Sequence, residues 1–221
     1  MLPSTSILSI LAVVTVPDQY TTVSSALSNT PSGTAILVKP GVYHEHLRVC
    51  DRRVILSTCS VSLNSSGLKP DSELKTVITD HAIGDLVVVD GEQAKLHMAG
   101  VCLSHRSHVS GNCVSVRRGS FQADSCVLTS AKGDGVYIVG DSKVALRRNT
   151  ISDCGAHGVY AWKGSVDMRD NVIRGSQYHG VFLFSGCDAV LVSNTVAANQ
   201  RAGVFVGGTC QLRRNTFTDN L

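Results

Sequence analysis

The chain of 221 residues is 43% hydrophobic and 17% charged, which provides enough apolar side chains for a large core and excludes a disordered chain. Its formal net charge of +3 is too small to indicate a nucleic-acid or membrane partner, and we expect neither. The eight cysteines contain no C-x-x-C pair, which argues against a zinc ribbon or a thioredoxin-like site, and we expect no metal and no cofactor.

The first 34 residues are interpreted as an N-terminal cap. Residues 1–16 are apolar, but they lack a basic start and an A-x-A cleavage site, so the pattern does not indicate a secretory signal. The same segment is too short to cross a membrane. We therefore expect it to form part of a cap or an edge strand.

A regular pattern begins only at residue 112. Residues 35–111 are irregular, with a loop predicted at Asn64–Ser72. From residue 112 onward two markers recur every 21 to 23 residues, namely a glycine before an apolar residue (Gly135, Gly158, Gly180 and Gly203) and an asparagine (Asn149, Asn171, Asn194 and Asn215). Counting back by one period places Cys126 at the position before Asn149. Two markers with one period indicate a repeat architecture.

Each repeat unit predicts strands separated by turns. The residues after the glycines read VYIV, VYAW, VFLF and VFVG, which are β-branched or aromatic and are flanked by turn residues. We therefore predict an all-β, right-handed parallel β-helix, in which each strand pairs with its equivalent in the next coil about 4.8 Å away. The expected parts are a cap (1–34), irregular first coils (35–111) and regular coils (112–221) that continue to or beyond the chain end. The asparagine column is predicted to be a structural ladder, because asparagine tolerates left-handed turns and stacked amides bond one another.

The segment Ile36–Glu45, with the sequence ILVKPGVYHE, resembles the I-x-V-x-P-G-x-Y-x-E start of pectate-lyase-like β-helices. The preceding Tyr20–Ser28 is similar to the short helix that caps the first coil in that superfamily. The later repeats are most similar to the non-catalytic β-helix of certain F-box proteins. The resemblance covers about residues 17–221 and implies a helix-capped β-helix with a substrate-recognition role, although no F-box-like helical segment is present.

Motifs for polysaccharide cleavage are not found in the sequence. A glycoside hydrolase needs two facing carboxylates, but the asparagine turns continue as NTI, NVI, NTV and NTF, and there is no D-D pair. A lyase needs clustered acidic residues for calcium and a basic proton abstractor, and these do not share a column either. We predict no catalytic residues and favour a chain without enzymatic activity.

One polar column is open to two interpretations. The residue before each repeat glycine is Asp134, His157, His179 or Ala202, so an aspartate and two histidines are expected in adjacent coils. They form either a general-base or metal site or, as we favour, a row of solvated turn residues.

Two cysteines are expected to share another column. Cys187 and Cys210 each lie six residues after the first valine of their coil, where they form either a disulfide or, as we favour, two packed thiols. Free cysteine packs well as a small apolar residue, and a solenoid core of this size needs no disulfides. We therefore expect a reducing compartment and a cytoplasmic location.

The strand after each glycine is expected to present alternate residues to opposite sides. The aliphatic first and third residues face inward, so six of the eleven aromatic residues of the chain are predicted to share the outward face: Tyr137, Tyr160, Trp162, Phe182, Phe184 and Phe205. A contiguous apolar patch of this kind usually marks a binding site. A protein partner or an adjoining segment is the favoured occupant, sugar rings are the second possibility, and a core position with the faces reversed is the third.

A basic stripe is predicted on the outer face of the next strand, where Arg147, Arg169 and Arg213 share a column. It suits an acidic partner or an anionic glycan, or it is a solvated surface. We predict a non-catalytic scaffold or recognition domain that binds a protein partner through the six aromatic residues and these three arginines. The alternatives are a carbohydrate-binding or polysaccharide-modifying protein and a structural rod in a larger assembly.

Overall fold

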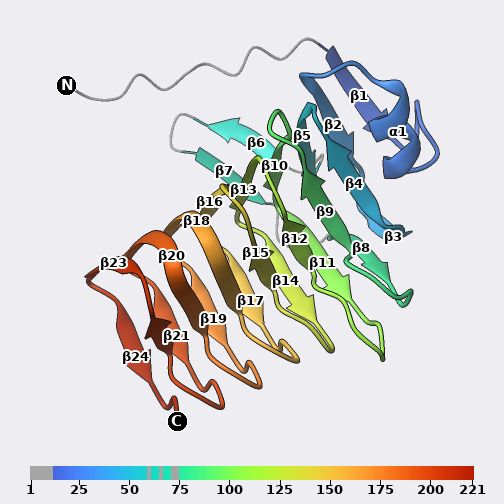
Figure 1. Cartoon of the computed structure of the whole chain (residues 1–221). Helices are drawn as coiled ribbons and strands as arrows, with labels where there is room; N and C mark the ends of the chain where they lie inside the picture. Colours follow the sequence, from blue (N-terminus) through green and yellow to red (C-terminus); the bar gives the residue numbers. More distant parts are fainter. Residues whose placement is uncertain (1–11, 59–60, 65–66, 71–74) are drawn as a thin grey trace.

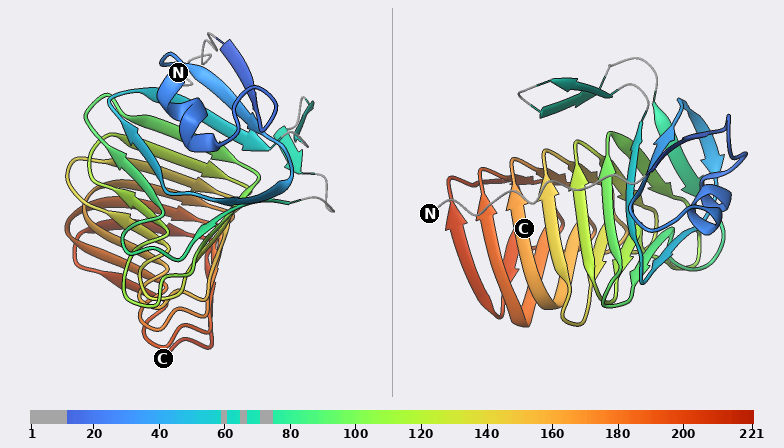
Figure 2. Two further views of the ribbon diagram at one scale, coloured as in Figure 1. Left: turned by 90° about the vertical axis from the view of Figure 1, so that its right-hand side faces the viewer. Right: turned by 90° about the horizontal axis from the view of Figure 1, so that it is seen from above.

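The computed structural model describes residues 12–58, 61–64, 67–70 and 75–221, with side chains described outside 59–74. These residues form a right-handed parallel β-helix of about eight turns with one short helix, which confirms the predicted fold class. The coils are stacked from α1 and β1 at one end to β24 at the other (Figures 1 and 2). In this described part, no helix is long and apolar enough to cross a membrane.

After the first coil, each coil contributes one strand to each of three faces, because the parallel strands pair with their equivalents in neighbouring coils. Face I contains β4 (Leu47–Cys50), β9 (Val87–Asp90), β12 (Val114–Val116), β15 (Val136–Ile138), the first parts of β18 (Val159–Arg169) and β20 (Val181–Val192), and β22 (Val204–Val206). Face II contains β1 (Ala12–Val16), β2 (Thr34–Val38), β5 (Arg53–Thr58), β10 (Lys95–Ala99), β13 (Ser120–Asp124), β16 (Lys143–Arg147), the second parts of β18 and β20, and β23 (Thr209–Arg213). Face III contains β3 (Gly41–His44), β8 (Thr76–Asp80), β11 (Val101–His105), β14 (Val127–Ser130), β17 (Thr150–Ser152), β19 (Val172–Arg174), β21 (Thr195–Ala197) and β24 (Thr216–Thr218).

The interior consists of columns of aliphatic side chains, one from each coil. On face I the register pairs Val114, Val136, Val159 and Val181 in order, and all four are fully buried. Burial of one such side chain stabilises the fold by roughly 1.5–3 kcal/mol. The repeated valine of the sequence therefore specifies the inner wall of the coil.

The predicted asparagine ladder lies between faces II and III and is completely buried in its middle. Asn171 Oδ1 accepts hydrogen bonds from the backbone N–H and Nδ2 of Asn149, at 2.9 and 3.0 Å, and Asn171 in turn donates to Asn194. The ladder begins at Cys126, whose N–H donates to Asn149 Oδ1. The left-handed residue is the one before each asparagine, such as Arg148 at φ 54°, so the predicted backbone reason for asparagine is wrong and amide bonding alone explains it.

A second, shorter asparagine ladder that the sequence analysis missed lies between faces III and I. Asn199 Nδ2 donates to Asn220 Oδ1 at 2.8 Å, and the backbone N–H of Ser176 donates to Asn199 Oδ1 at 3.0 Å. The two ladders together hold the corners of the last coils.

The first coils are built differently. Helix α1 (Val23–Asn29) covers the first coil, and the Glu45 carboxylate accepts hydrogen bonds from the N–H groups of Val23 and Ser24 at its start. Strand β1 pairs in parallel with β2 as an edge strand. An antiparallel hairpin of β6 (Val61–Asn64) and β7 (Gly67–Pro70) projects from the coils (Figure 2), so the loop predicted at Asn64–Ser72 contains a strand.

The predicted column of Cys187 and Cys210 is wrong. Cys187 pairs in register with Gly164, and Cys210 pairs with Ala189. Between faces I and II, β20 has two residues more than the following coil, which moves Cys210 by two positions. All the cysteines within the described residues are free thiols, and Cys59 lies outside those residues.

Candidate functional site

The six predicted aromatic residues lie on the outside of face I and at its border with face II. Tyr137, Tyr160, Phe182 and Phe205 are register partners in successive coils, and Trp162 and Phe184 form a second, shorter row. Their inward neighbours Val159 and Ala161 are fully buried. The reversed arrangement, with the rings in the core, is therefore excluded.

The rings of each row are stacked on one another. Tyr160 and Phe182 have centroids 5.2 Å apart and planes 3° apart, and Phe182 and Phe205 follow at 4.8 Å and 6°. Trp162 and Phe184 are closest, at 4.0 Å and 9°. Because neighbouring rings cover one another's faces, mainly ring edges remain for contact with other molecules.

Histidine rings extend this row, which the sequence analysis did not anticipate. His157 and His179 stack with centroids 5.4 Å apart and planes 7° apart, and His157 also contacts the rings of Tyr160 and Phe182. Tyr178, a residue outside the predicted set, contacts His157 at 5.4 Å and carries the Arg201 guanidinium over its ring. We call the following nine residues the aromatic–histidine surface: Tyr137, His157, Tyr160, Trp162, Tyr178, His179, Phe182, Phe184 and Phe205.

Asp134 does not join the histidines as a site. Its carboxylate is almost completely buried and accepts a hydrogen bond from the His157 backbone N–H at 2.8 Å. It belongs to a row of side chains that each lie two residues before a face I strand. In this row Asp85 accepts a hydrogen bond from the backbone N–H of Asn112, and the Asn112 side chain accepts one from the backbone N–H of Asp134. Asp134 therefore holds a corner of the coil, and the favoured prediction of a solvated turn residue is wrong for it.

Burial shifts the pKa values of these groups in opposite directions. Desolvation, with a smaller contribution from Asp85, raises the pKa of Asp134 to about 6. Desolvation, together with His179 and Arg201, lowers the pKa of His157 to about 4. Desolvation also lowers the pKa of His179. At neutral pH both histidine rings are consequently uncharged and fit an apolar surface.

The three predicted arginines lie on face II, so the structure divides the predicted binding residues between two faces. Arg147 and Arg169 are register partners, but Val192 separates Arg169 from Arg213 and interrupts the stripe. Arg169 Nε lies 2.8 Å from Asp167 Oδ1, and Arg147 approaches the same carboxylate at 3.8 Å. Two of the three arginines are thus partly neutralised.

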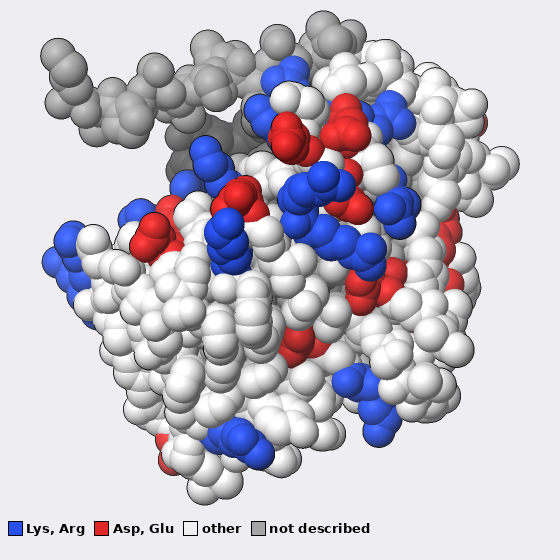
Figure 3. Space-filling view, in the orientation of Figure 1, with Lys and Arg blue, Asp and Glu red and all other residues white. Residues whose placement is uncertain are grey.

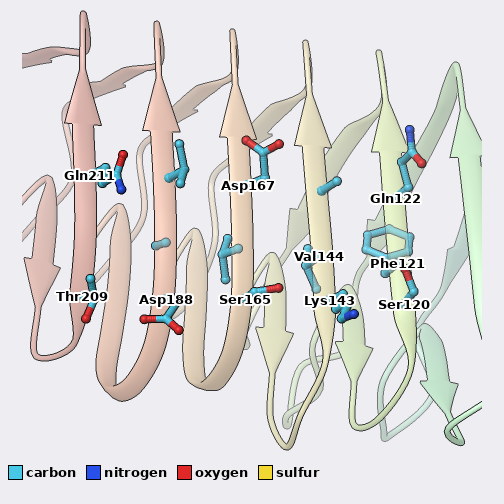
Figure 4. A pocket seen from close by; sticks show the side chains of 14 residues that line it. Ser120, Phe121, Gln122, Lys143, Val144, Ser165, Asp167, Asp188, Thr209 and Gln211 are labelled. Atoms are coloured by element: carbon cyan, nitrogen blue, oxygen red, sulfur yellow. The ribbon is translucent and has the colours of Figure 1, made fainter. Parts of the chain in front are cut away.

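A groove on face II was missed by the sequence analysis. Side chains from β13, β16, β18, β20 and β23 line a hollow of about 450 Å³ (Figure 4), and it adjoins a second hollow of about 1170 Å³ over β5, β10, β13 and β16. The two share Ser120, Gln122 and Lys143. No sequence signal marks this groove, because its residues come from different coils and follow no common motif.

The described residues hold no group of three or more His, Cys, Asp or Glu side chains that could bind a metal ion. Charged side chains gather over the first coils around β9, β10 and β12, whereas the surface over β19, β21 and β24 carries few (Figure 3). With no metal-binding cluster among the described residues, the aromatic–histidine surface and the groove on face II are the two candidate sites.

Comparison with solved structures shows a likeness of fold to a pectin methylesterase. The chain is similar to the pectin methylesterase from Aspergillus niger, with 12% identity and a TM-score of 0.53 over 96% of this chain and 85% of that one. A pectin methylesterase variant in complex with a hexasaccharide has 14% identity and a TM-score of 0.43, and this chain, 89% of which is covered, spans 57% of its length. The likeness to the Aspergillus niger enzyme, at this low identity, shows the fold alone.

The sequence was also compared with curated proteins and with protein families. No curated protein matches it. The family described as the right handed beta helix region matches residues 87–221, which is more than half of the chain. The chain therefore belongs to the right-handed β-helix region family.

Proposed function

We propose that the chain is a non-catalytic recognition module that binds a partner protein through the aromatic–histidine surface. The observation that carries this proposal is the exposure of stacked rings on an outer strand face, with Trp162 48% and Phe205 45% exposed, next to Tyr178 at 42% in the adjoining turn. A strand face in contact only with water is ordinarily polar. Tryptophan and tyrosine are frequent anchors of protein interfaces, and a contiguous apolar patch usually marks such a contact.

The ring geometry favours a protein over a sugar on this surface. A sugar ring packs against the face of an aromatic ring, but Tyr160 and Phe182 each stack on a ring at both faces, and Trp162 and Phe184 cover one face of each other. Apolar side chains of a protein pack equally well against ring edges, which prefer edge-to-face contacts. The surface is therefore suited to the apolar face of a helix or strand from a partner.

Two further considerations support the proposal and one supports an alternative. The resemblance of the repeats to the recognition β-helices of F-box proteins fits a protein-binding role, and the free cysteines fit a reducing, cytoplasmic location. The pectin methylesterase fold likeness supports carbohydrate binding as the alternative function, at a site other than the covered ring faces.

Site-specific photo-crosslinking tests the proposal. A photoreactive phenylalanine analogue replaces Trp162 in one variant and Val172, exposed on face III, in the matched control. We expect a discrete protein adduct from position 162 only. The protein so identified is then purified and titrated against the chain, and Trp162→Ala with Tyr178→Ala is expected to weaken binding at least 30-fold, while Val172→Ala leaves it unchanged.

Three outcomes contradict the proposal. Equal adducts from positions 162 and 172, or an affinity that the double variant does not change, would show that the surface is no docking site and favour a structural rod. A saturable shift of Trp162 fluorescence with a neutral or acidic oligosaccharide would instead show that this surface binds a sugar.

A further inference from the structure

We propose that the partner protein places an amphipathic helix with acidic residues along the corner between faces III and I. This inference rests on the proposed function and names the kind of segment that docks. The corner borders the aromatic–histidine surface, because it contains Tyr178 between β19 and β20, and it continues from there toward the first coils. In Figure 1 the loops of this corner follow one another along the lower edge of the β-helix.

The corner loops are packed directly against one another. A Cβ atom added to Gly111 would overlap the Gly84 carbonyl oxygen, and one added to Gly133 would overlap that of Gly111. Further along, the Ala156 N–H donates to the Gly133 carbonyl and the Tyr178 N–H to the Ala156 carbonyl, both at 3.0 Å. The tips of the loops therefore form one continuous ridge with the coil spacing of about 4.8 Å.

Exposed apolar side chains recur along this ridge. Ile83 and Val109 are largely exposed on the loops before β9 and β12, and Tyr178 follows in the loop before β20. Exposed apolar residues that lie singly on a surface need no explanation, but these are aligned with the aromatic–histidine surface. They extend the apolar area of that surface by several coils toward the capped end.

The charged side chains that the ridge exposes are all basic. Arg106, Lys132 and Arg201 are exposed, and in the described part of the chain none of them forms an ion pair. The two carboxylates of the same loops, Asp85 and Asp134, are largely buried and accept hydrogen bonds from the corner backbone. A segment that covers the ridge is therefore expected to combine apolar with acidic side chains. We call the following six residues the corner ridge: Ile83, Arg106, Val109, Lys132, Tyr178 and Arg201.

The spacing of the corner ridge fits an α-helix. Three residues of a helix rise about 4.5 Å and four rise about 6 Å, so a helix along the corner can set one side chain per turn against each coil. Ile83 and Tyr178 are four coils apart, about 19 Å, which corresponds to about 13 residues of helix. Apolar anchors at i, i+3, i+4 and i+7 are the usual pattern of helix recognition.

The backbone pairing of the corner argues against an added strand. Strand addition requires an open sheet edge, but β9, β12, β15 and β18 are each paired on both sides. Backbone groups of the corner also bond between coils, as the Arg201 N–H does to the Tyr178 carbonyl at 3.1 Å. The ridge thus offers side chains for recognition, which is how an amphipathic helix binds.

Crosslinking from two points of the corner ridge tests the inference on the partner protein that position 162 captures. The photoreactive phenylalanine analogue replaces Val109 in one variant and Tyr178 in another, and mass spectrometry identifies the crosslinked residues of the partner. The two positions are three coils apart, about 14 Å. We expect crosslinked sites about 10 residues apart in one segment for a helix, against about four for an extended strand.

Matched apolar variants measure the contribution of the ridge beyond the aromatic–histidine surface. Ile83→Ala with Val109→Ala is expected to weaken binding of the purified partner at least tenfold. Val42→Ala with Val172→Ala, at two exposed valines of face III, is expected to change it less than twofold. Circular dichroism confirms that both double variants fold.

A charge reversal tests the acidic character of the helix. Lys132→Glu is expected to weaken binding at least tenfold, because a basic contact becomes a repulsive one. The same reversal at the exposed Arg174 of face III is expected to change the affinity less than twofold.

Failure of the inference can be told apart from failure of the proposed function. No adduct from position 162 would remove both. An adduct from position 162 without one from position 109 would overturn the helix along the corner ridge alone. Crosslinked sites about four residues apart, sites in separate segments of the partner, or equal losses in the ridge and face III variants would do the same.

Discussion

Two corners of the β-helix, one between faces II and III in the last coils and one between faces III and I in the middle coils, are held by different side chains for the same purpose. In the last coils, asparagine amides both donate and accept, so Asn149, Asn171 and Asn194 form a continuous ladder. In the middle coils, Asp85 and Asp134 accept the backbone N–H of the next coil but donate no hydrogen bond to it. An ionised carboxylate has no donor to pass on, so a column of carboxylates cannot continue as a ladder.

The difference shows why one corner of the coils is visible as a repeat in the sequence and another is not. An amide ladder requires the same residue in every coil, and its period is easily recognised. A corner held by a mixture of Asp85, Asn112 and Asp134 satisfies the same backbone groups with varied residues. This corner, just before β9, β12 and β15, is therefore regular in backbone hydrogen bonding but varied in sequence.

The largest predicted effect is on the asparagine ladder. Asn171→Ala removes two accepted and two donated hydrogen bonds at a position that is 1% exposed, and the buried Asn149 N–H loses its acceptor. We expect the free energy of unfolding to fall by about 4 kcal/mol, measured by urea denaturation.

Asn215→Ala, at the less buried last rung, is the matched control and is expected to cost about half as much. Equal effects at both positions would show that burial does not strengthen the ladder.

The second prediction converts a carboxylate corner into an amide corner. The pKa of Asp134 in the folded chain, about 6, lies above its ordinary value, so its contribution to stability is complete below pH 4 and is lost as pH rises through 6. Asp134→Asn keeps the acceptor for the His157 N–H and removes this loss. We expect the variant to be more stable than the wild type by about 2 kcal/mol at pH 7.5 and by nothing at pH 3.5. A gain at both pH values would mean that burial of charge is not the cause.

The third prediction concerns the histidine part of the aromatic–histidine surface. The pKa of His157, lowered to about 4, means that its contribution to stability is complete above pH 6.5 and is lost as pH falls through 4. His157→Phe keeps a ring in the stack and removes the titration. Because the ring is only half buried, we expect a gain of about 1 kcal/mol at pH 4 and little change at pH 7.5. An imidazole NMR titration that gives an ordinary pKa for His157 would contradict the explanation.

The smallest predicted effect on stability is at the proposed binding surface. Trp162→Ala removes one stacked pair at a residue that is 48% exposed, so we expect a loss of about 1 kcal/mol in urea denaturation, and a smaller loss for Trp162→Phe. A loss comparable to that of Asn171→Ala would indicate that the rings serve the fold and not a partner.

Much of the fold and part of the site could be predicted because neighbouring coils repeat the same residues. The recurring Gly–Val pair placed Val136, Val159 and Val181 inside and the aromatic residues outside, and the structure has them so. Counting failed where coils differ in length, as the two extra residues of β20 displaced Cys210 from the column of Cys187.

The sequence by itself determined the parallel β-helix, the asparagine ladder and the outward aromatic row, because each depends on residues one period apart. Only the tertiary structure decided how different columns meet. It joined His157 and Tyr178 to the aromatic row, placed the arginines on another face and formed a groove from Lys95, Lys143 and Gln211. The physical reason is that contacts between columns depend on where each corner turns the chain, and no periodic signal in the sequence records those angles.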